Sequence, residues 1–155
     1  LYYQTYGLET VGFRYFNVFG PRQDPNSQYA AAIPKFITAL IQNEAPTIFG
    51  DGEQTRDFTY IKNVVNANLK AAEVTDPNVF GQAYNVGCGD RISLNDLITT
   101  IKSITGATVE PLYTDPRPGD VRDSQADLTR LQKAFDLGAL VSLSDGLGQT
   151  INSYH

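Results

Sequence analysis

Apolar side chains recur three and four positions apart in several segments, which is typical of helices with one buried face. Capping residues mark one of these helices clearly, because Ser93 opens the segment SLNDLITTIKSITG and Gly106 closes it. The predicted helices cover about 30–42, 62–74 (with Val64, Val65, Leu69 and Ala72 on the apolar face), 93–106, 127–138 (capped by Asp127) and 144–154 (capped by Ser144), and residues 1–6 end a further helix at Gly7.

Short segments rich in β-branched and aromatic residues alternate with these helices and predict strands. The segment 10–16 (TVGFRYF) has the character of a buried strand, and 17–21 is expected to end it in a turn. Further strands are predicted at about 47–49, 56–61, 83–86 and 109–113. Because strands and helices alternate, we predict an α/β fold. No repeat or linker interrupts the pattern, so residues 1–155 are predicted to form one domain.

Composition narrows the functional classes. The 155 residues are 41% hydrophobic and carry a formal net charge of −5, which argues against a general nucleic-acid binder. No apolar run reaches the roughly 18 residues of a membrane span. The single cysteine, Cys88, and the single histidine, His155, leave almost no material for a disulfide, a histidine-ligated metal or a Ser-His-Asp triad. We therefore expect no metal, no membrane association and a reducing, cytoplasmic location.

The chain contains no methionine and opens inside a predicted helix, so we expect it to be a piece of a longer protein. Two glycine patterns, Gly87-Cys88-Gly89 and Gly50-Asp51-Gly52, invite comparison with the dinucleotide fingerprint. Both lack its third glycine, and the helix after Gly89 begins several residues too late to hold a pyrophosphate at its N-terminus. We predict that both are plain turns.

Three arginines are candidates for anion recognition. Arg56 follows a glycine-rich turn, and Arg117 and Arg122 lie in the loop DPRPGDVRDS. A guanidinium can bind phosphate oxygens in a bidentate manner. The alternative is pairing with nearby carboxylates, which are Asp57, Asp115, Asp120 and Asp123.

Four segments occur in the order found in one enzyme family: RYFNVFGPRQDP, IFGDGEQTRDFTYI, AYNVGCGDRISLNDL and PRPGDVRDSQADLTR. With them the chain resembles the C-terminal half of an extended short-chain dehydrogenase/reductase acting on nucleotide sugars. It is most similar to the UDP-N-acetylglucosamine and UDP-glucose 4-epimerases. The resemblance implies a Rossmann-type α/β fold whose NAD-binding half is absent from the chain. It also implies an NAD-dependent parent enzyme, a UDP-sugar substrate and a homodimeric parent.

The resemblance also implies roles for individual residues. Asn17 and Arg56 match residues that contact the diphosphate, and either Arg117 or Arg122 matches a second phosphate arginine. Tyr15 and Phe16 match residues beside the nicotinamide ring. The remaining positions match the lining of the sugar or uracil pocket: Gln23, Ala31, Ala32, Thr47, Ile48, Phe49 and Thr129.

The family's Tyr-x-x-x-Lys base is absent, because no lysine of the chain has a tyrosine four residues before it. We expect this motif upstream of Leu1, so no catalytic residue is assigned and the 155 residues alone are expected to be inactive. The implied reaction inverts C4 of a UDP-hexose or UDP-N-acetylhexosamine by transient hydride abstraction. The alternatives are a nucleotide-sugar 4,6-dehydratase or decarboxylase of the same family, or a non-catalytic nucleotide-sugar-binding module.

Overall fold

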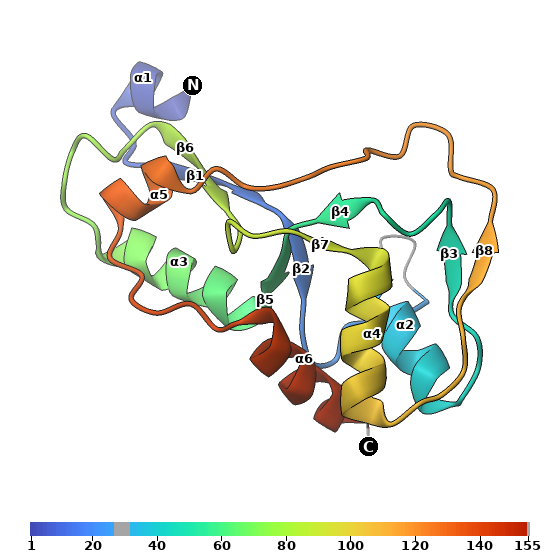
Figure 1. Cartoon of the computed structure of the whole chain (residues 1–155). Coiled ribbons are helices and arrows are strands. Elements are labelled where there is room, and N and C mark those ends of the chain that lie inside the picture. The colour runs from blue at the N-terminus through green and yellow to red at the C-terminus, as the bar shows by residue number, and fades with distance from the viewer. Residues whose placement is uncertain (27–31, 155) are drawn as a thin grey trace.

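The computed structural model describes residues 1–26 and 32–154 and confirms the predicted α/β class (Figure 1). Its helices are α1 (Tyr2–Tyr6), α2 (Ala32–Ile41), α3 (Ile61–Glu73), α4 (Leu94–Thr105), α5 (Thr129–Ala134), α6 (Leu143–Ile151) and the 3₁₀ helix η1 (Asn152–Tyr154). Its strands are β1 (Val11–Tyr15), β2 (Asn17–Phe19), β3 (Thr47–Phe49), β4 (Thr55–Arg56), β5 (Phe58–Tyr60), β6 (Gln82–Val86), β7 (Ile92–Ser93) and β8 (Leu112–Thr114). Among the described residues, no helix has the length and apolar character needed to cross a membrane.

The strands pair two by two, and each pair joins segments far apart in the chain. β1 with β6, β2 with β5 and β3 with β8 are parallel, whereas β4 and β7 are antiparallel. α3 and α5 lie beside β1 and β6, while α2, α4 and α6 gather at the other end of the molecule (Figure 1). Parallel pairs require such long connections, which here contain most of the helices.

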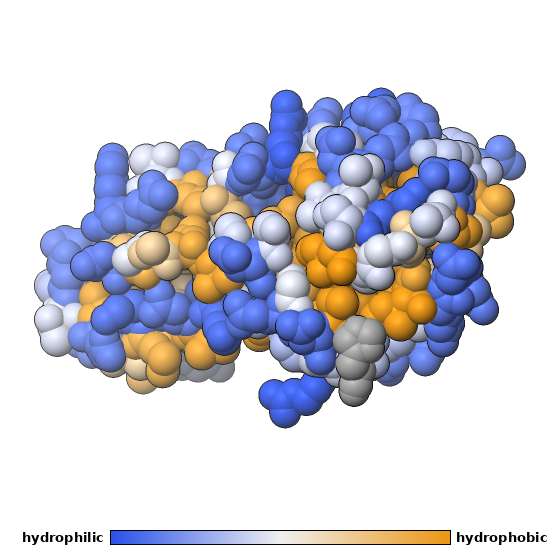
Figure 2. Space-filling view, turned by 60° about the horizontal axis from the view of Figure 1, so that its bottom comes forward, coloured by the Kyte–Doolittle hydropathy of each residue, from blue (hydrophilic) through white to orange (hydrophobic). Residues whose placement is uncertain are grey.

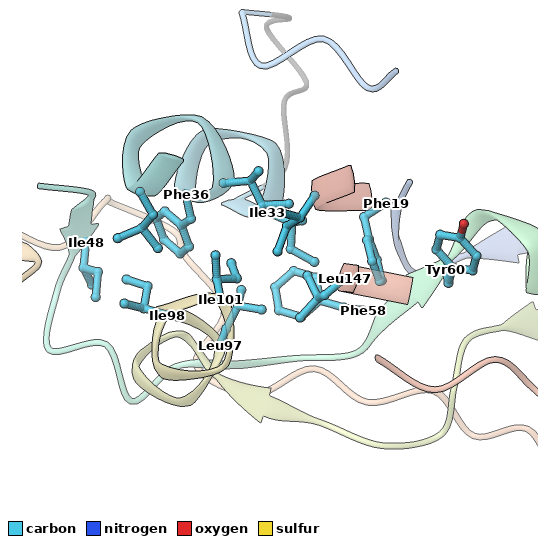
Figure 3. Close-up of a cluster of buried hydrophobic side chains, with 13 residues drawn as sticks. Phe19, Ile33, Phe36, Ile48, Phe58, Tyr60, Leu97, Ile98, Ile101 and Leu147 are labelled. Carbon is cyan, nitrogen blue, oxygen red and sulfur yellow. The ribbon is translucent and has the colours of Figure 1, made fainter. Parts of the chain in front are cut away.

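Two hydrophobic clusters stabilise this arrangement. The larger one packs α2, α4 and α6 together, with Ile33, Leu97 and Leu147 at its centre and fully buried (Figure 3). Phe19 and Tyr60 continue it toward the β2–β5 pair, with their ring centroids 5.5 Å apart. The smaller cluster lies between α3, α5 and the β1–β6 pair. The cavity described below is bordered by elements of the larger cluster.

The best-marked helix of the sequence is confirmed almost to the residue. In α4, the Ser93 hydroxyl oxygen accepts a hydrogen bond from the backbone N–H of Asp96 at 3.0 Å. Gly106 ends the helix with φ of +76°, a conformation that favours glycine. Gly7 ends α1 in the same manner.

The last helix begins two residues earlier than the sequence predicts. The cap is Ser142, whose hydroxyl oxygen accepts from the Asp145 N–H at 3.1 Å, and Ser144 is already helical. Both serines have a suitable side chain, but only Ser142 has an acidic residue three positions on, which completes a capping box.

The predicted apolar face of α3 is wrong in three of its four members. Val65 and Leu69 are 49% and 58% exposed and Ala72 is exposed as well, whereas the buried positions are Asn63, Val64 and Ala67. Asn63 can be buried because its side-chain amide donates to the Val141 carbonyl and accepts from the Val141 N–H. Figure 2 shows a face of the molecule on which apolar residues reach the surface in separate patches.

Three predictions about strands and turns also need correction. The segment expected as one strand at 56–61 is divided between β4 and β5, because the Asp57 side chain turns into the interior between them. The segment 17–21 is not a turn throughout, since 17–19 forms β2. β1 is not a buried strand, and Tyr15 is half exposed because only one face of the β1–β6 pair is covered by the smaller cluster.

Candidate functional site

A cavity of about 510 Å³ lies beside α2, between β3, β4 and the segment that follows β8. Six residues with predicted binding roles line it: Asn17, Ala32, Thr47, Phe49, Arg56 and Arg117. They come from five separate segments of the chain, so the fold brings together what the sequence separates. A hollow of this size suits a small organic ligand.

The floor of the cavity is built by strand alternation. Thr47 and Phe49 of β3 line the cavity, whereas Ile48 between them is fully buried in the larger cluster. The Ile48 side chain therefore contributes packing, and only its backbone remains near a ligand. Asn17 begins β2, and its side-chain amide donates to the Asp57 carbonyl at 3.4 Å.

Two guanidinium groups make one wall of the cavity positive. Arg56 is mostly buried, donates to the Thr55 carbonyl at 2.7 Å and forms an ion pair with Asp120. The Arg117 guanidinium lies over the Phe49 ring, 3.8 Å from its centroid. An anionic ligand that enters here meets both groups, and it competes with Asp120 for Arg56.

Arg122 has a different position. It does not line this cavity, and its guanidinium donates to the Asp51 carboxylate at 2.7 Å. This hydrogen bond lowers the pKa of the Asp51 carboxyl and raises that of Arg122. Arg56 thus pairs with Asp120, one of the carboxylates in the predicted alternative, whereas Arg122 pairs with Asp51, which that alternative did not include. Arg117 is the arginine of this loop that lines the cavity.

Among the residues that the structure describes, the remaining predicted ones do not line the cavity. Gln23 donates from its side chain to the Val18 carbonyl at 3.2 Å, and Thr129 is exposed at the start of α5. Ala31 lies outside the described residues. Tyr15 and Phe16, predicted beside the nicotinamide, border a second hollow that they share with Asn17 and Ser124.

The sequence analysis missed most of the apolar part of the cavity lining and three of its polar or charged residues, which are Lys35, Gln54 and Asp120. Gln54 is 6% exposed and donates to the Phe49 carbonyl at 2.6 Å, while its Oε1 has no hydrogen-bond partner among the described residues. The sequence could have indicated Gln54, because it lies in the segment GDGEQTRDF, two residues before Arg56. Asp120 was considered only as a partner for an arginine.

Neither glycine pattern offers a phosphate site. At Gly87–Gly89 the backbone N–H groups of Cys88 and Gly89 donate to the Asp57 carboxylate, each at 2.9 Å. An anion of the protein itself thus fills this turn. At the other pattern, the Asn95 side chain packs against Gly52, where a Cβ would lie 2.1 Å from its oxygen. The residues of these turns therefore do not fit the phosphates of a dinucleotide.

The described residues also offer neither an activated cysteine nor a metal site. Burial and then the nearby Asp57 charge raise the pKa of the Cys88 thiol, which makes it a poor nucleophile at neutral pH. No group of His, Cys, Asp or Glu side chains suited to a metal ion occurs within residues 1–26 and 32–154. The two guanidinium groups suit the cavity to an anionic ligand.

Comparisons with known proteins find similar chains among proteins named for reactions of UDP-sugars. The UDP-glucose 4-epimerase of Mycolicibacterium smegmatis is 36% identical over 99% of this chain and 48% of that protein. The UDP-N-acetyl-alpha-D-glucosaminuronate decarboxylase of Bacillus cytotoxicus is 31% identical over 96% of this chain and 47% of that protein. The solved UDP-N-acetylglucosamine 4-epimerase from Methanobrevibacter ruminantium, in complex with UDP-N-acetylmuramic acid, is similar with a TM-score of 0.88, 40% identity and coverage of 99% and 48%.

The chain spans about half the length of the curated relatives it matches. The profile of the NAD dependent epimerase/dehydratase family matches residues 1–87, which is more than half of the chain. This match contains Asn17 and Arg56 and all four strands that contribute residues to the cavity lining, β2 to β5. The chain belongs to the NAD dependent epimerase/dehydratase family.

Proposed function

We propose that this chain is the nucleotide-sugar-binding part of an NAD-dependent UDP-sugar 4-epimerase. The observation that carries the proposal is that Arg56, Arg117 and Asn17 line one cavity although they lie far apart in the sequence. A diphosphate carries about two negative charges, and a chain with a net charge of −5 needs local positive charge to hold it. The two guanidinium groups supply that charge.

The remaining lining suits the rest of a nucleotide sugar. β3 presents Thr47 and backbone groups along which a planar base can lie, since extended backbone offers hydrogen bonds, whereas Phe49 at the other end of β3 lies under the Arg117 guanidinium. Phe36, Ala39 and Pro46 supply apolar surface beside it. We assign the uracil to this side of the cavity and the diphosphate to the arginine side.

The described residues bind and orient the substrate in this proposal, and no chemical step is assigned to them. Their glycine turns do not fit dinucleotide phosphates, so the NAD that the family name implies is held mainly by residues beyond this chain. Tyr15 and Phe16 border a hollow together with Asn17, which supports the proposal that the nicotinamide lies there, beside the sugar. We further propose a cytoplasmic homodimeric parent protein and one domain formed by residues 1–155.

A decarboxylase or a 4,6-dehydratase is the second candidate. Relatives with these activities match nearly the whole chain at 31% and 32% identity, so the substrate-binding part alone is compatible with more than one reaction. The choice depends on which acid and base groups face the sugar.

The test is to incubate the intact protein that carries this chain with UDP-N-acetylglucosamine, UDP-glucose or UDP-glucuronate, to separate the products by anion-exchange chromatography and to determine their masses. The proposal expects the C4 epimer of one of these sugars, with no loss of mass. A product lighter by one water supports the dehydratase, and turnover of UDP-glucuronate with release of CO₂ supports the decarboxylase. UDP binding without any turnover of the three substrates supports the non-catalytic module.

A further inference from the structure

Asp57 is a fully buried carboxylate that the proposed function leaves without a role. Its Oδ1 accepts from the Cys88 N–H at 2.9 Å and from the Thr59 hydroxyl at 3.3 Å. Its Oδ2 accepts from the N–H groups of Gly89 at 2.9 Å and Ala126 at 3.1 Å. Within the described ranges, no lysine or arginine forms an ion pair with it.

Burying such a carboxylate costs free energy of folding. A buried charge is strongly destabilising unless hydrogen bonds replace its water, and here backbone N–H groups surround it as they surround bound anions. The approach is close, because a Cβ at Gly87 would lie 2.7 Å from Oδ2 of Asp57 and 2.5 Å from Cβ of Ala126. Three segments of the chain therefore converge on one carboxylate.

One of these segments forms part of the candidate site. We call residues 115–126 the strap; it carries Arg117 and Asp120 along the cavity and ends at Ala126. At its start, the strap continues from β8, which pairs with β3 of the cavity floor. At its end, Ala126 is bound by Asp57, and the Gln125 side chain donates to the Gly89 carbonyl at 2.6 Å.

The strap is also joined to the strand that carries Arg56. The Thr55 N–H donates to the Arg122 carbonyl at 2.8 Å, and the Ser124 N–H donates to the Thr55 carbonyl at 3.2 Å. Arg56 and Asp57 are adjacent, so Arg56 faces the cavity while Asp57 enters the interior and binds the end of the strap. These two adjacent residues thus connect the wall of the cavity with the end of the strap.

We propose that Asp57 is a positioning residue, whose carboxylate takes the place of an anion in the Gly87–Gly89 turn and fixes the strap so that Arg56 and Arg117 face one ligand. This inference rests on the proposed function, because it concerns how the same cavity is kept in shape. It adds a residue that touches neither substrate nor cofactor and acts through the two arginines.

The first test replaces Asp57 by asparagine in the intact protein, with Glu9→Gln as the matched control, since Glu9 is an exposed carboxylate outside the site. We expect KM for the UDP-sugar to rise about tenfold, equivalent to one net hydrogen bond, with kcat within about twofold of the parent. Trypsin should cleave after Arg122 in the strap faster in Asp57→Asn than in the parent or in Glu9→Gln. A folded Asp57→Asn protein with unchanged KM and unchanged cleavage overturns the proposal.

A second pair of variants decides the question if Asp57→Asn does not fold. Gly87→Ala pushes a methyl group toward Asp57 and Ala126, whereas Gly148→Ala places one in open space in α6. Gly87 does not have a positive φ, so alanine is sterically permitted by the backbone there. We expect higher KM and faster cleavage after Arg122 for Gly87→Ala alone, and equal behaviour of the two variants overturns the proposal.

The cleavage assay also separates this inference from the proposed function. If the parent protein binds no UDP-sugar, the proposed function fails, while faster cleavage in Asp57→Asn still shows that Asp57 fixes the strap. If the parent binds UDP-sugar and neither variant changes KM or cleavage, the proposed function stands and the role of Asp57 is refuted.

Discussion

Replacing Arg56 by alanine tests the assignment of the diphosphate most directly. In the structure, the Arg56 guanidinium is bonded to the Thr55 carbonyl and paired with Asp120. A diphosphate that binds here gains two charge-assisted hydrogen bonds from Arg56 and displaces the one to Asp120, so the net gain is about one such bond. This net bond contributes about 1.5–3 kcal/mol. We therefore expect the Kd of UDP to rise about 10- to 140-fold in Arg56→Ala.

The measurement is isothermal titration calorimetry of UDP with the intact protein at constant ionic strength. Arg56→Lys should recover only part of the lost affinity, because an ammonium group cannot reproduce the two parallel bonds of a guanidinium. Arg14→Ala is the matched control, since Arg14 is an exposed arginine of β1 that does not line the cavity. An unchanged Kd in Arg56→Ala, or an equal loss in Arg14→Ala, refutes the assignment.

Four further outcomes are expected. By the same calorimetry, Arg117→Ala should weaken UDP binding, whereas Arg122→Ala, an exposed residue outside the cavity, should change the Kd by less than about twofold. Iodoacetamide should alkylate Cys88 at pH 8 more slowly than a peptide thiol, because burial raises its pKa; mass spectrometry gives the rates, and equal rates contradict this environment. Leu147→Ala should lower the free energy of unfolding by about 2–5 kcal/mol in urea titrations, and the exposed control Val121→Ala by less than about 0.5 kcal/mol. The 155-residue chain alone should show no turnover of UDP-N-acetylglucosamine by chromatography, and product above the buffer blank would place the catalytic groups within it.

The sequence predicts correctly an element such as α4, whose ends are determined by residues close to it in the chain. α4 follows from Ser93, Asp96 and Gly106, because a capping box and a C-terminal glycine act within one turn of the helix. The same logic failed at α6, where two serines lie two positions apart and the choice depends on the acidic residue that follows Ser142.

Tertiary contacts decide the features that the sequence could not reveal. The pattern of α3 does not show that Asn63 is buried, since its hydrogen bonds go to Val141, a residue far along the chain. Similarly, a strand pattern over 56–61 gives no sign that Asp57 turns inward to meet Gly89 and Ala126. Polar residues in the interior are favourable only when their partners are present, and those partners lie in other segments.

The candidate site, too, could be predicted only in part from the sequence. The motifs that carry the family resemblance led to Arg56, Asn17 and β3, all of which line the cavity. Arg117 and Arg122 could not be separated by sequence, because both lie in one irregular loop and only the paths of their side chains distinguish them. Thr129 was assigned on the resemblance alone, and the structure places it on an exposed helix start.

The pairing of distant strands has a consequence for how the protein is made. β3 is synthesised long before its partner strand, because its residue Thr47 pairs with Leu112. The same is true of β1, in which Val11 pairs with Gln82. Chains dominated by such non-local contacts fold slowly, since the entropy of closing long loops must be lost before the contacts form. During synthesis, β3 therefore has no strand partner until the segment beyond Leu112 has emerged from the ribosome. The cavity cannot be complete before then, because Arg117 and Asp120 of its lining follow that segment.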